Sequence, residues 1–168
     1  MAEDGPKFDP LGLLASLDRH RVAYIVIGAF GRVVQGAEEI TRGVDVVPST
    51  KPENLRRLEG ALAELDARRV DGRAVDLGQQ KQADERVVEL STARGELKVV
   101  LEPTGTRGYD DLRRAATREP LGRGIRPSVA SVDDLARMLA ALGREEDQAK
   151  LRALRLLAEL ERGRGLEL

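Results

Sequence analysis

Several kinds of side chain are scarce or missing in this 168-residue chain, and each scarcity excludes a class of protein. There is no cysteine, which excludes a disulfide scaffold, a cysteine nucleophile and any metal site built on thiolate ligands. The single histidine, His20, excludes a histidine-rich metal site. Aromatic residues make up only 2% of the chain, so few rings are present for stacking on nucleic-acid bases.

Neither sign of charge dominates the sequence. The chain carries 28 Lys and Arg against 29 Asp and Glu, a formal net charge of −1, so no overall field attracts nucleic acid or an anionic membrane. No apolar run approaches the ~20 residues that a membrane span needs, and the first residues lack the basic-then-apolar pattern of a signal peptide. We therefore expect a cytoplasmic protein with no membrane association, for which nucleic acid is a disfavoured partner.

The hydrophobic pattern predicts one continuous α/β (α+β) unit, a mixed β-sheet of about four to five strands flanked by helices. Leucines after Pro10 predict a first helix, and a Thr-x-x-Glu capping box at Thr50 predicts a helix that runs to about Leu65. Strands are predicted at residues 23–27, 44–47, 86–91 and 96–101, with the last two forming a hairpin. Another helix is predicted at residues 30–35, and residues 68–84 are predicted to hold at most one short edge strand.

Two helices are predicted near the end of the chain. The first begins at a capping box opened by Ser131, and the second covers residues 145–161. The leucines predicted to be buried on the last helix are Leu151, Leu154, Leu157 and Leu160. The chain therefore divides into a core at residues 1–125, a C-terminal helical segment at 126–162 that packs on the core, and a tail at 163–168.

The stretch most informative about function lies between Tyr24 and Pro48. The strand that begins it ends at Gly28-Ala29, where a helix starts, and such a turn offers backbone N–H groups to a phosphate. The next strand carries Asp45, whose carboxylate can face that turn. On these residues alone, an ordinary glycine turn and a solvated aspartate are the simpler explanation of the pattern.

In combination, these residues resemble the nucleotidyltransferase superfamily with the polymerase-β-like core, especially the minimal nucleotidyltransferases of toxin–antitoxin and phage-defence systems. The resemblance covers about residues 11–160 and implies two divalent ions held by three carboxylates, which serve to transfer a nucleotide to a protein or RNA acceptor. The segments that carry it are Gly28-Ala29, Thr41-Arg42-Gly43-Val44-Asp45, Gly95-Glu96-Leu97-Lys98-Val99-Val100, Pro103-x-Gly105, Tyr109-x-Asp111-Leu112, Ser131-x-Asp133-Asp134-Leu135 and Gly143-Arg144-x-x-Asp147.

The sequence departs from the family pattern at the carboxylates. Gly43 occupies the position of the first, Asp45 that of the second and Lys98 that of the third. Because magnesium requires hard anionic ligands, we expect no metal here and impaired catalysis. Instead, Asp45 and Lys98 are predicted to contact each other directly. Two unit charges ~4 Å apart attract by roughly 4 kcal/mol at an effective dielectric constant near 20, before desolvation is subtracted.

Three functions stay open at this point. The first is a non-catalytic module that binds a nucleotide or phosphate through Gly28, Ala29 and Lys98, or that acts as the partner-binding half of a toxin–antitoxin-like pair. The second is an active, magnesium-dependent nucleotidyltransferase that combines Asp45 with Glu96 or Glu102, although even Glu96 lies about 7 Å along the strand from Lys98. The third is a filled cleft, with function only in homo-oligomer or protein-partner surfaces.

Overall fold

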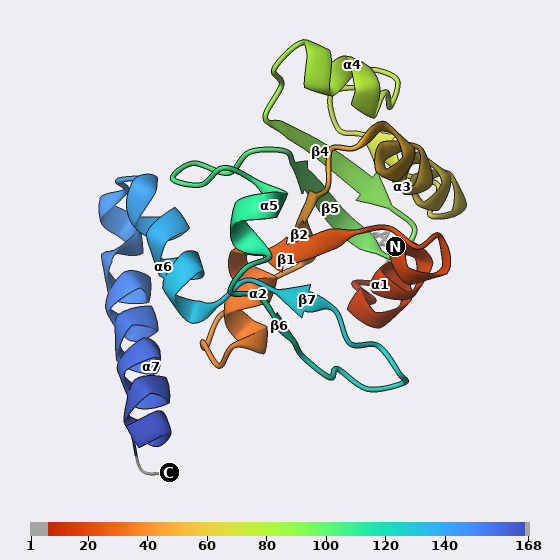
Figure 1. Ribbon diagram of the computed structural model, residues 1–168. Helices are drawn as coiled ribbons and strands as arrows, with labels where there is room; N and C mark the ends of the chain where they lie inside the picture. Colours follow the sequence, from red (N-terminus) through yellow and green to blue (C-terminus); the bar gives the residue numbers. More distant parts are fainter. Residues whose placement is uncertain (1–6, 167–168) are drawn as a thin grey trace, which may run out of the picture.

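A seven-stranded mixed sheet runs through the computed structural model, which describes residues 7–166 (Figure 1). The strand order is β3-β4-β5-β2-β1-β7-β6. β2 pairs in parallel with β5, and β1 in parallel with β7, while the remaining pairs are antiparallel. The strands are β1 (Tyr24–Ile27), β2 (Gly43–Pro48), β3 (Arg68–Arg69), β4 (Val87–Thr92), β5 (Gly95–Val100), β6 (Thr117–Arg118) and β7 (Ser128–Val129).

The predicted α/β class and mixed sheet are confirmed, and the sheet has more strands than predicted. The four longer strands, β1, β2, β4 and β5, are those that the hydrophobic pattern indicated. β3 is the one short edge strand that residues 68–84 were predicted to allow. The additional strands β6 and β7 have two residues each, too short to produce a recognisable alternation. β7 belongs to the sheet, so the predicted boundary near residue 126 falls just before a sheet strand.

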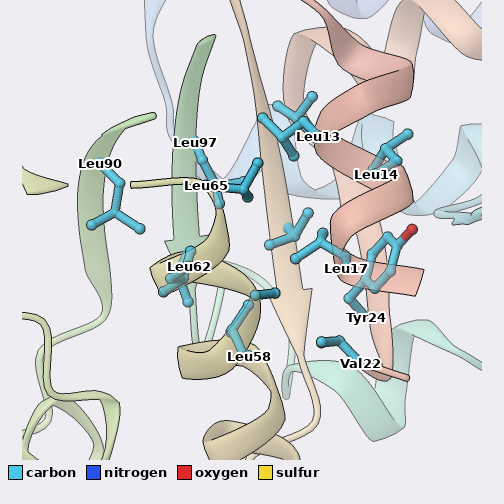
Figure 2. Packing of buried hydrophobic residues seen from close by; sticks show 14 of the residues in the cluster. Leu13, Leu14, Leu17, Val22, Tyr24, Leu58, Leu62, Leu65, Leu90 and Leu97 are labelled. Atoms are coloured by element: carbon cyan, nitrogen blue, oxygen red, sulfur yellow. The ribbon is translucent and has the colours of Figure 1, made fainter. Parts of the chain in front are cut away.

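Two helices, α1 (Pro10–Arg19) and α3 (Pro52–Glu64), cover one face of the sheet with leucines. Figure 2 shows Leu13 and Leu17 of α1 and Leu58 and Leu62 of α3 packed toward the strands, near Leu97 of β5. The start of α1 is capped by Asp9, whose side chain accepts a hydrogen bond from the Gly12 N–H at 2.9 Å. These residues belong to the larger of the two hydrophobic clusters. The cluster packs against one face of strands β2, β4 and β5 and so holds these strands in place.

The predicted capping box at Thr50 is wrong. The residue before α3 is Lys51, and no side chain caps the helix. Pro52 at the first helical position supplies the required backbone angle and has no N–H that needs a cap. A short helix that the pattern did not predict, α4 (Leu77–Gln82), follows in residues 68–84; its cap is Asp76, which accepts a hydrogen bond from the Gln79 N–H at 2.9 Å.

The other face of the sheet is covered only in part. Its helices are α2 (Gly28–Val34), α5 (Tyr109–Leu112), α6 (Val132–Ala141) and, after the 3₁₀ turn η1 (Glu145–Asp147), α7 (Gln148–Leu166). Ile25, Ile27 and Val47 are buried in one cluster with the apolar residues of α6 and α7. The polar side chains of β2, β5 and β4 on this same face have no such apolar partners, which leaves room for a site.

The C-terminal helices follow the prediction closely. The Ser131 hydroxyl accepts a hydrogen bond from the Asp134 N–H at 3.0 Å, which confirms the predicted cap. Leu151 and Leu154 are buried and Leu157 is partly buried, but Leu160 is 51% exposed, so its predicted burial is wrong. The buried side of α7 continues at Ala158, and Leu160, nine residues after Leu151, lies on the opposite side of the helix. Most of the predicted tail at 163–168 is helical to Leu166, and residues 1–6 and 167–168 lie outside the described residues. Within residues 7–166, no helix has both the length and the apolar character needed to cross a bilayer.

Candidate functional site

A cavity of about 650 Å³ opens over the uncovered part of the sheet. Its volume lies within the range of small-molecule sites in proteins. β2 and β5 contribute its polar floor, the loop at residues 35–42 contributes one wall, and α6 contributes another. Gly28, Ala29, Gly43, Asp45 and Lys98, the five residues predicted from the sequence, all line this one cavity, together with Glu96 and Glu102.

Asp45 and Lys98 lie on neighbouring strands at the floor of the cavity. They are register partners in the parallel pair of β2 and β5, and Glu89 of β4 is the next residue in the same row, opposite Lys98. The predicted direct contact is nevertheless wrong: in the described part of the chain, no ion pair within 4.0 Å joins Asp45 to Lys98. Lys98 stands between two carboxylates and is exposed, while the Asp45 carboxylate lies toward Gly28 on the opposite side.

Two features of the turn between β1 and α2 require glycine at position 28. Its φ of +69° lies in the left-handed region that residues with a side chain rarely adopt. A Cβ atom at this position would also lie 2.4 Å from Oδ2 of Asp45. The turn between β1 and α2 therefore brings its backbone directly against the carboxylate, as the strand-glycine-helix pattern predicted.

Burial raises the pKa of Asp45, the main effect on this group. Lys98 and Arg32 oppose this effect through their positive charges, and Glu89 reinforces it. Among the hydrogen bonds of residues 7–166 there is none that the Asp45 side chain accepts. Because the Asp45 carboxylate is partly buried and accepts no hydrogen bond within the described chain, its ionised form is unfavourable. A cation in the cavity or a bound proton would stabilise the group.

Gly43 allows an unusually close approach of β2 to β5. A Cβ atom built there would lie 2.6 Å from the carbonyl oxygen and 2.8 Å from the Cβ of Glu96, its register partner. A side chain at this position requires movement of the strand backbone. The paired strands therefore leave no space for a carboxylate side chain at the position that the resemblance assigns to the first acid.

The residues present do not fit a two-metal centre. Of the three positions that the resemblance assigns to acids, Asp45 alone is acidic, and Lys98, its register partner, carries a positive charge. In the described chain no three His, Cys, Asp or Glu side chains are grouped so as to hold a metal ion. Glu96 and Glu102 line the cavity but do not complete such a group with Asp45.

The cavity is instead lined by more basic than acidic side chains. The basic residues are Arg32, Arg42, Arg86, Lys98 and Arg144, and the acidic residues are Asp45, Glu96 and Glu102. Within residues 7–166, no carboxylate lies within 4.0 Å of the charged groups of Arg42, Arg86 or Lys98. The sequence did not predict that Arg86, just before β4, and Arg32, on α2, line this cavity. Only the folded sheet brings them together there.

The two remaining arginines are held by carboxylates. Arg32 donates to both oxygens of Glu39 at 2.6 and 3.0 Å, and Lys150 lies 3.7 Å from the same carboxylate. Burial alone would raise the pKa of Glu39, but the two cations outweigh it and lower that pKa. Arg144, in the predicted Gly143-Arg144-x-x-Asp147 segment, donates to Asp147 at 2.5 Å after a turn at Gly143, whose φ is +64°. These pairs fix the loop at residues 35–42 and the end of α6 beside the cavity.

No protein-family model and no curated protein matches this chain. Among solved structures, it is similar to a Thermotoga maritima protein provisionally described as a nucleotidyltransferase. The two share 18% sequence identity, the likeness covers 89% of this chain and 90% of the other, and the TM-score is 0.54. At this level of identity the comparison concerns the arrangement of the backbone. The chain therefore has a nucleotidyltransferase-like fold.

Proposed function

We propose that this protein binds a phosphate-bearing ligand in the 650 Å³ cavity without a metal ion, and that it does not catalyse nucleotidyl transfer. The observation that carries the proposal is the charge of the cavity floor and rim. Arg42, Arg86 and Lys98 have no carboxylate partner within the described chain, whereas a single carboxylate occupies the three family positions. Unpaired cations that surround a concave site are suited to phosphate oxygens.

Lys98 is central to this proposal. In a nucleotidyltransferase, divalent ions neutralise the phosphates; here the ammonium group of Lys98 projects from the floor of the cavity and can neutralise them directly. Gly28 and Ala29 are placed to let a ligand approach the backbone closely beside Asp45. A ligand that brings negative charge is repelled by the ionised form of Asp45, so its binding favours the protonated form of this group.

Isothermal titration calorimetry with inorganic triphosphate in excess EDTA tests the proposal. We expect a single site whose affinity falls about tenfold in Lys98→Ala and in Arg42→Ala, because each loses a charge-assisted hydrogen bond. Arg57→Ala is the matched control, since Arg57 is exposed on α3 and lines none of the described cavities. Absence of binding, or an equal loss in all three variants, contradicts the proposal.

The pH dependence of the same titration provides a second check. Burial raises the pKa of Asp45, so the carboxylate is neutral over a wider range of acidic pH than an ordinary aspartate. Affinity for triphosphate is expected to rise as the pH is lowered toward this raised pKa, and Asp45→Asn should bind more tightly at pH 8 with a smaller dependence on pH. An unchanged pH profile in Asp45→Asn would show that this group does not face the anion.

The absence of transfer activity is tested separately, with labelled nucleoside triphosphates, magnesium and the protein's own side chains or tRNA as acceptor. We expect no labelled product. Labelled product that is lost in Asp45→Asn would instead support the active enzyme that uses Asp45 with Glu96 or Glu102. Lys98→Asp alone should not create activity, because a third carboxylate would still be missing and position 43 has no room for one.

A partner-binding role is the second candidate, and one observation favours it. Leu156 and Leu160 lie one turn apart on α7 and are 57% and 51% exposed. Apolar side chains in this arrangement suit a second helix, and a second copy of this chain is the simplest partner. Multi-angle light scattering should then report a dimer that Leu160→Glu converts to a monomer; a monomer in both cases would contradict this role.

A further inference from the structure

The helix α7 carries a second apolar stripe, on the side turned away from the rest of the fold. α7 lies at the outer edge of the molecule, packed along α6 (Figure 1). Its residues Leu151, Leu154 and Ala158 are buried in the cluster that α7 shares with α6. Leu156 and Leu160 are 57% and 51% exposed, and at about 100° per residue they lie on the side opposite to the buried stripe. α7 is therefore apolar on two opposite sides, and the described part of the chain covers one of them.

The exposed stripe has the spacing of a coiled coil. It consists of Ala149, Ala153, Leu156, Leu160 and Gly163, which are all exposed and follow one another at alternating intervals of four and three residues. These are the intervals between the inner positions of a coiled coil, and the five residues fall within about 80° of the helix circumference. A side of a helix that faces only water normally carries polar residues instead. The spacing indicates a side of α7 that is suited to pack against another helix.

Two charged residues flank this stripe along one edge. Arg152 and Glu159 are seven residues apart, so they lie on the same side of the helix, and both are exposed. Among the side chains that the structure describes, neither has an ion-pair partner within 4.0 Å. Residues at such flanking positions form ion pairs between the helices of a coiled coil and thereby set the orientation of the helices. An edge with one positive and one negative charge is complementary to itself when a second copy of the helix runs in the opposite direction.

We propose that α7 pairs in antiparallel orientation with α7 of a second copy of this chain, with Ala153 of each copy opposite Leu156 of the other. The inference rests on the second candidate function, self-association, and specifies the orientation and register of the two copies. In this register Ala149 lies opposite Leu160, so that each leucine of the stripe packs against a small residue. Twofold symmetry forms every one of these contacts twice.

The charges favour this register over the alternatives. It brings Arg152 beside Glu159 of the second copy, twice in each dimer. An antiparallel register in which Leu156 faces Leu160 would bring the two copies of Glu159 together, and like charges repel. A parallel pair would place Arg152 beside the uncharged Leu157, so that this arginine would have no carboxylate partner.

Charge reversal tests the register. One helix from each copy forms a small interface, so the dissociation constant of the dimer is expected in the micromolar range, where sedimentation velocity measures it. Arg152→Glu and Glu159→Arg should each raise this constant about three- to tenfold, because each replaces two attractions by two repulsions. The variant that combines both changes should return to within about twofold of the unchanged protein. A combined variant that dimerises no more tightly than the single variants would overturn the register.

Arg57→Glu is the matched control for these variants. It makes the same change of charge at an exposed position on α3, outside α7, and should leave the dissociation constant unchanged. All of the substituted side chains are exposed, so the variants should fold.

Single cysteines test the orientation independently, because the chain has no cysteine of its own. In the proposed pair, position 149 lies opposite position 160 of the second copy and about 16 Å along the helix from position 149 of the second copy. A short bis-maleimide cross-linker should therefore join the two chains in an equal mixture of Ala149→Cys and Leu160→Cys, but not in either variant alone. A mixture of Arg57→Cys and Leu160→Cys is the control and should give no cross-linked product.

The outcomes separate the arrangement from self-association itself. If either cysteine variant alone cross-links as readily as the mixture, the antiparallel register is wrong, although the two copies do associate through α7. If the protein is a dimer but the mixture does not cross-link, another surface joins the copies, and the arrangement is also wrong. If the protein is a monomer throughout the micromolar range, the second candidate function fails, and this pairing fails with it.

Discussion

Replacement of Gly28 by alanine tests the geometry of the site most directly. The new Cβ would lie 2.4 Å from Oδ2, 2.9 Å from Cγ and 3.1 Å from Cβ of Asp45, and the residue would keep a φ of +69°. A left-handed backbone costs a residue with a side chain about 1 kcal/mol relative to glycine. Turning the carboxylate away relieves the first two contacts but leaves the third, because strand β2 holds the Cβ; the distorted rotamer adds about 1 kcal/mol. We expect a total loss of about 2–3 kcal/mol in the free energy of unfolding.

Gly143→Ala is the matched control for this prediction. Gly143 has a φ of +64°, and nothing lies within 4 Å of a Cβ built there, so only the backbone cost of about 1 kcal/mol applies. Urea denaturation of both variants measures the difference, and Asp45→Ala in the Gly28→Ala background should recover the steric part as a coupling of about 1 kcal/mol. Equal losses for the two glycines, or additive effects of Gly28→Ala and Asp45→Ala, would refute the contact between the turn and the carboxylate.

Three further substitutions have definite expected outcomes in denaturation experiments. Because burial raises the pKa of Asp45, its ionisation destabilises the fold at pH values above the ordinary aspartate pKa of 3.8. Asp45→Asn should therefore raise the free energy of unfolding at pH 7, and the gain should shrink as the pH falls through the raised pKa and disappear well below 3.8, where the folded and the unfolded aspartate are both protonated. Gly43→Ala should cost about 1–3 kcal/mol, because its Cβ would overlap the carbonyl oxygen of Glu96; an unchanged midpoint would show that β2 and β5 separate freely there. Arg69→Ala should cost about 2 kcal/mol, since the side chain is 7% exposed and is bonded to two carboxylates, whereas Arg68→Ala, at 81% exposure, should change stability by less than about 0.5 kcal/mol.

Local sequence signals identified the elements that hold the site. The β-branched run before Gly28 and the leucines after Pro10 specify a strand and a helix through their periodicity, and Ser131 caps α6 as its spacing with Asp134 indicated. The failures are equally informative. Strands of two residues leave no periodic trace, and Leu160 lies on the outer side of α7, away from the buried stripe that contains Leu151, Leu154 and Ala158.

For the candidate site, the sequence indicated which residues share a cleft but not how they interact. The register of β2 and β5 places Asp45 opposite Lys98, as expected from their strands. Within the described chain their side chains nevertheless form no ion pair within 4.0 Å, and the Asp45 carboxylate lies against the Gly28 turn. Side-chain orientation depends on the packing around each strand, and no local pattern reports it.

By itself, the amino-acid sequence determined the fold class and the main strands and helices, because each of these depends on residue types and their spacing along the chain. Only the tertiary structure decided that Gly43 has no room for a side chain, and that Arg32, Arg86, Ile40, Val87 and Leu142 line the same cavity. The reason is that these features depend on distances between strands, loops and helices that are remote in sequence, and packing of the whole sheet sets those distances.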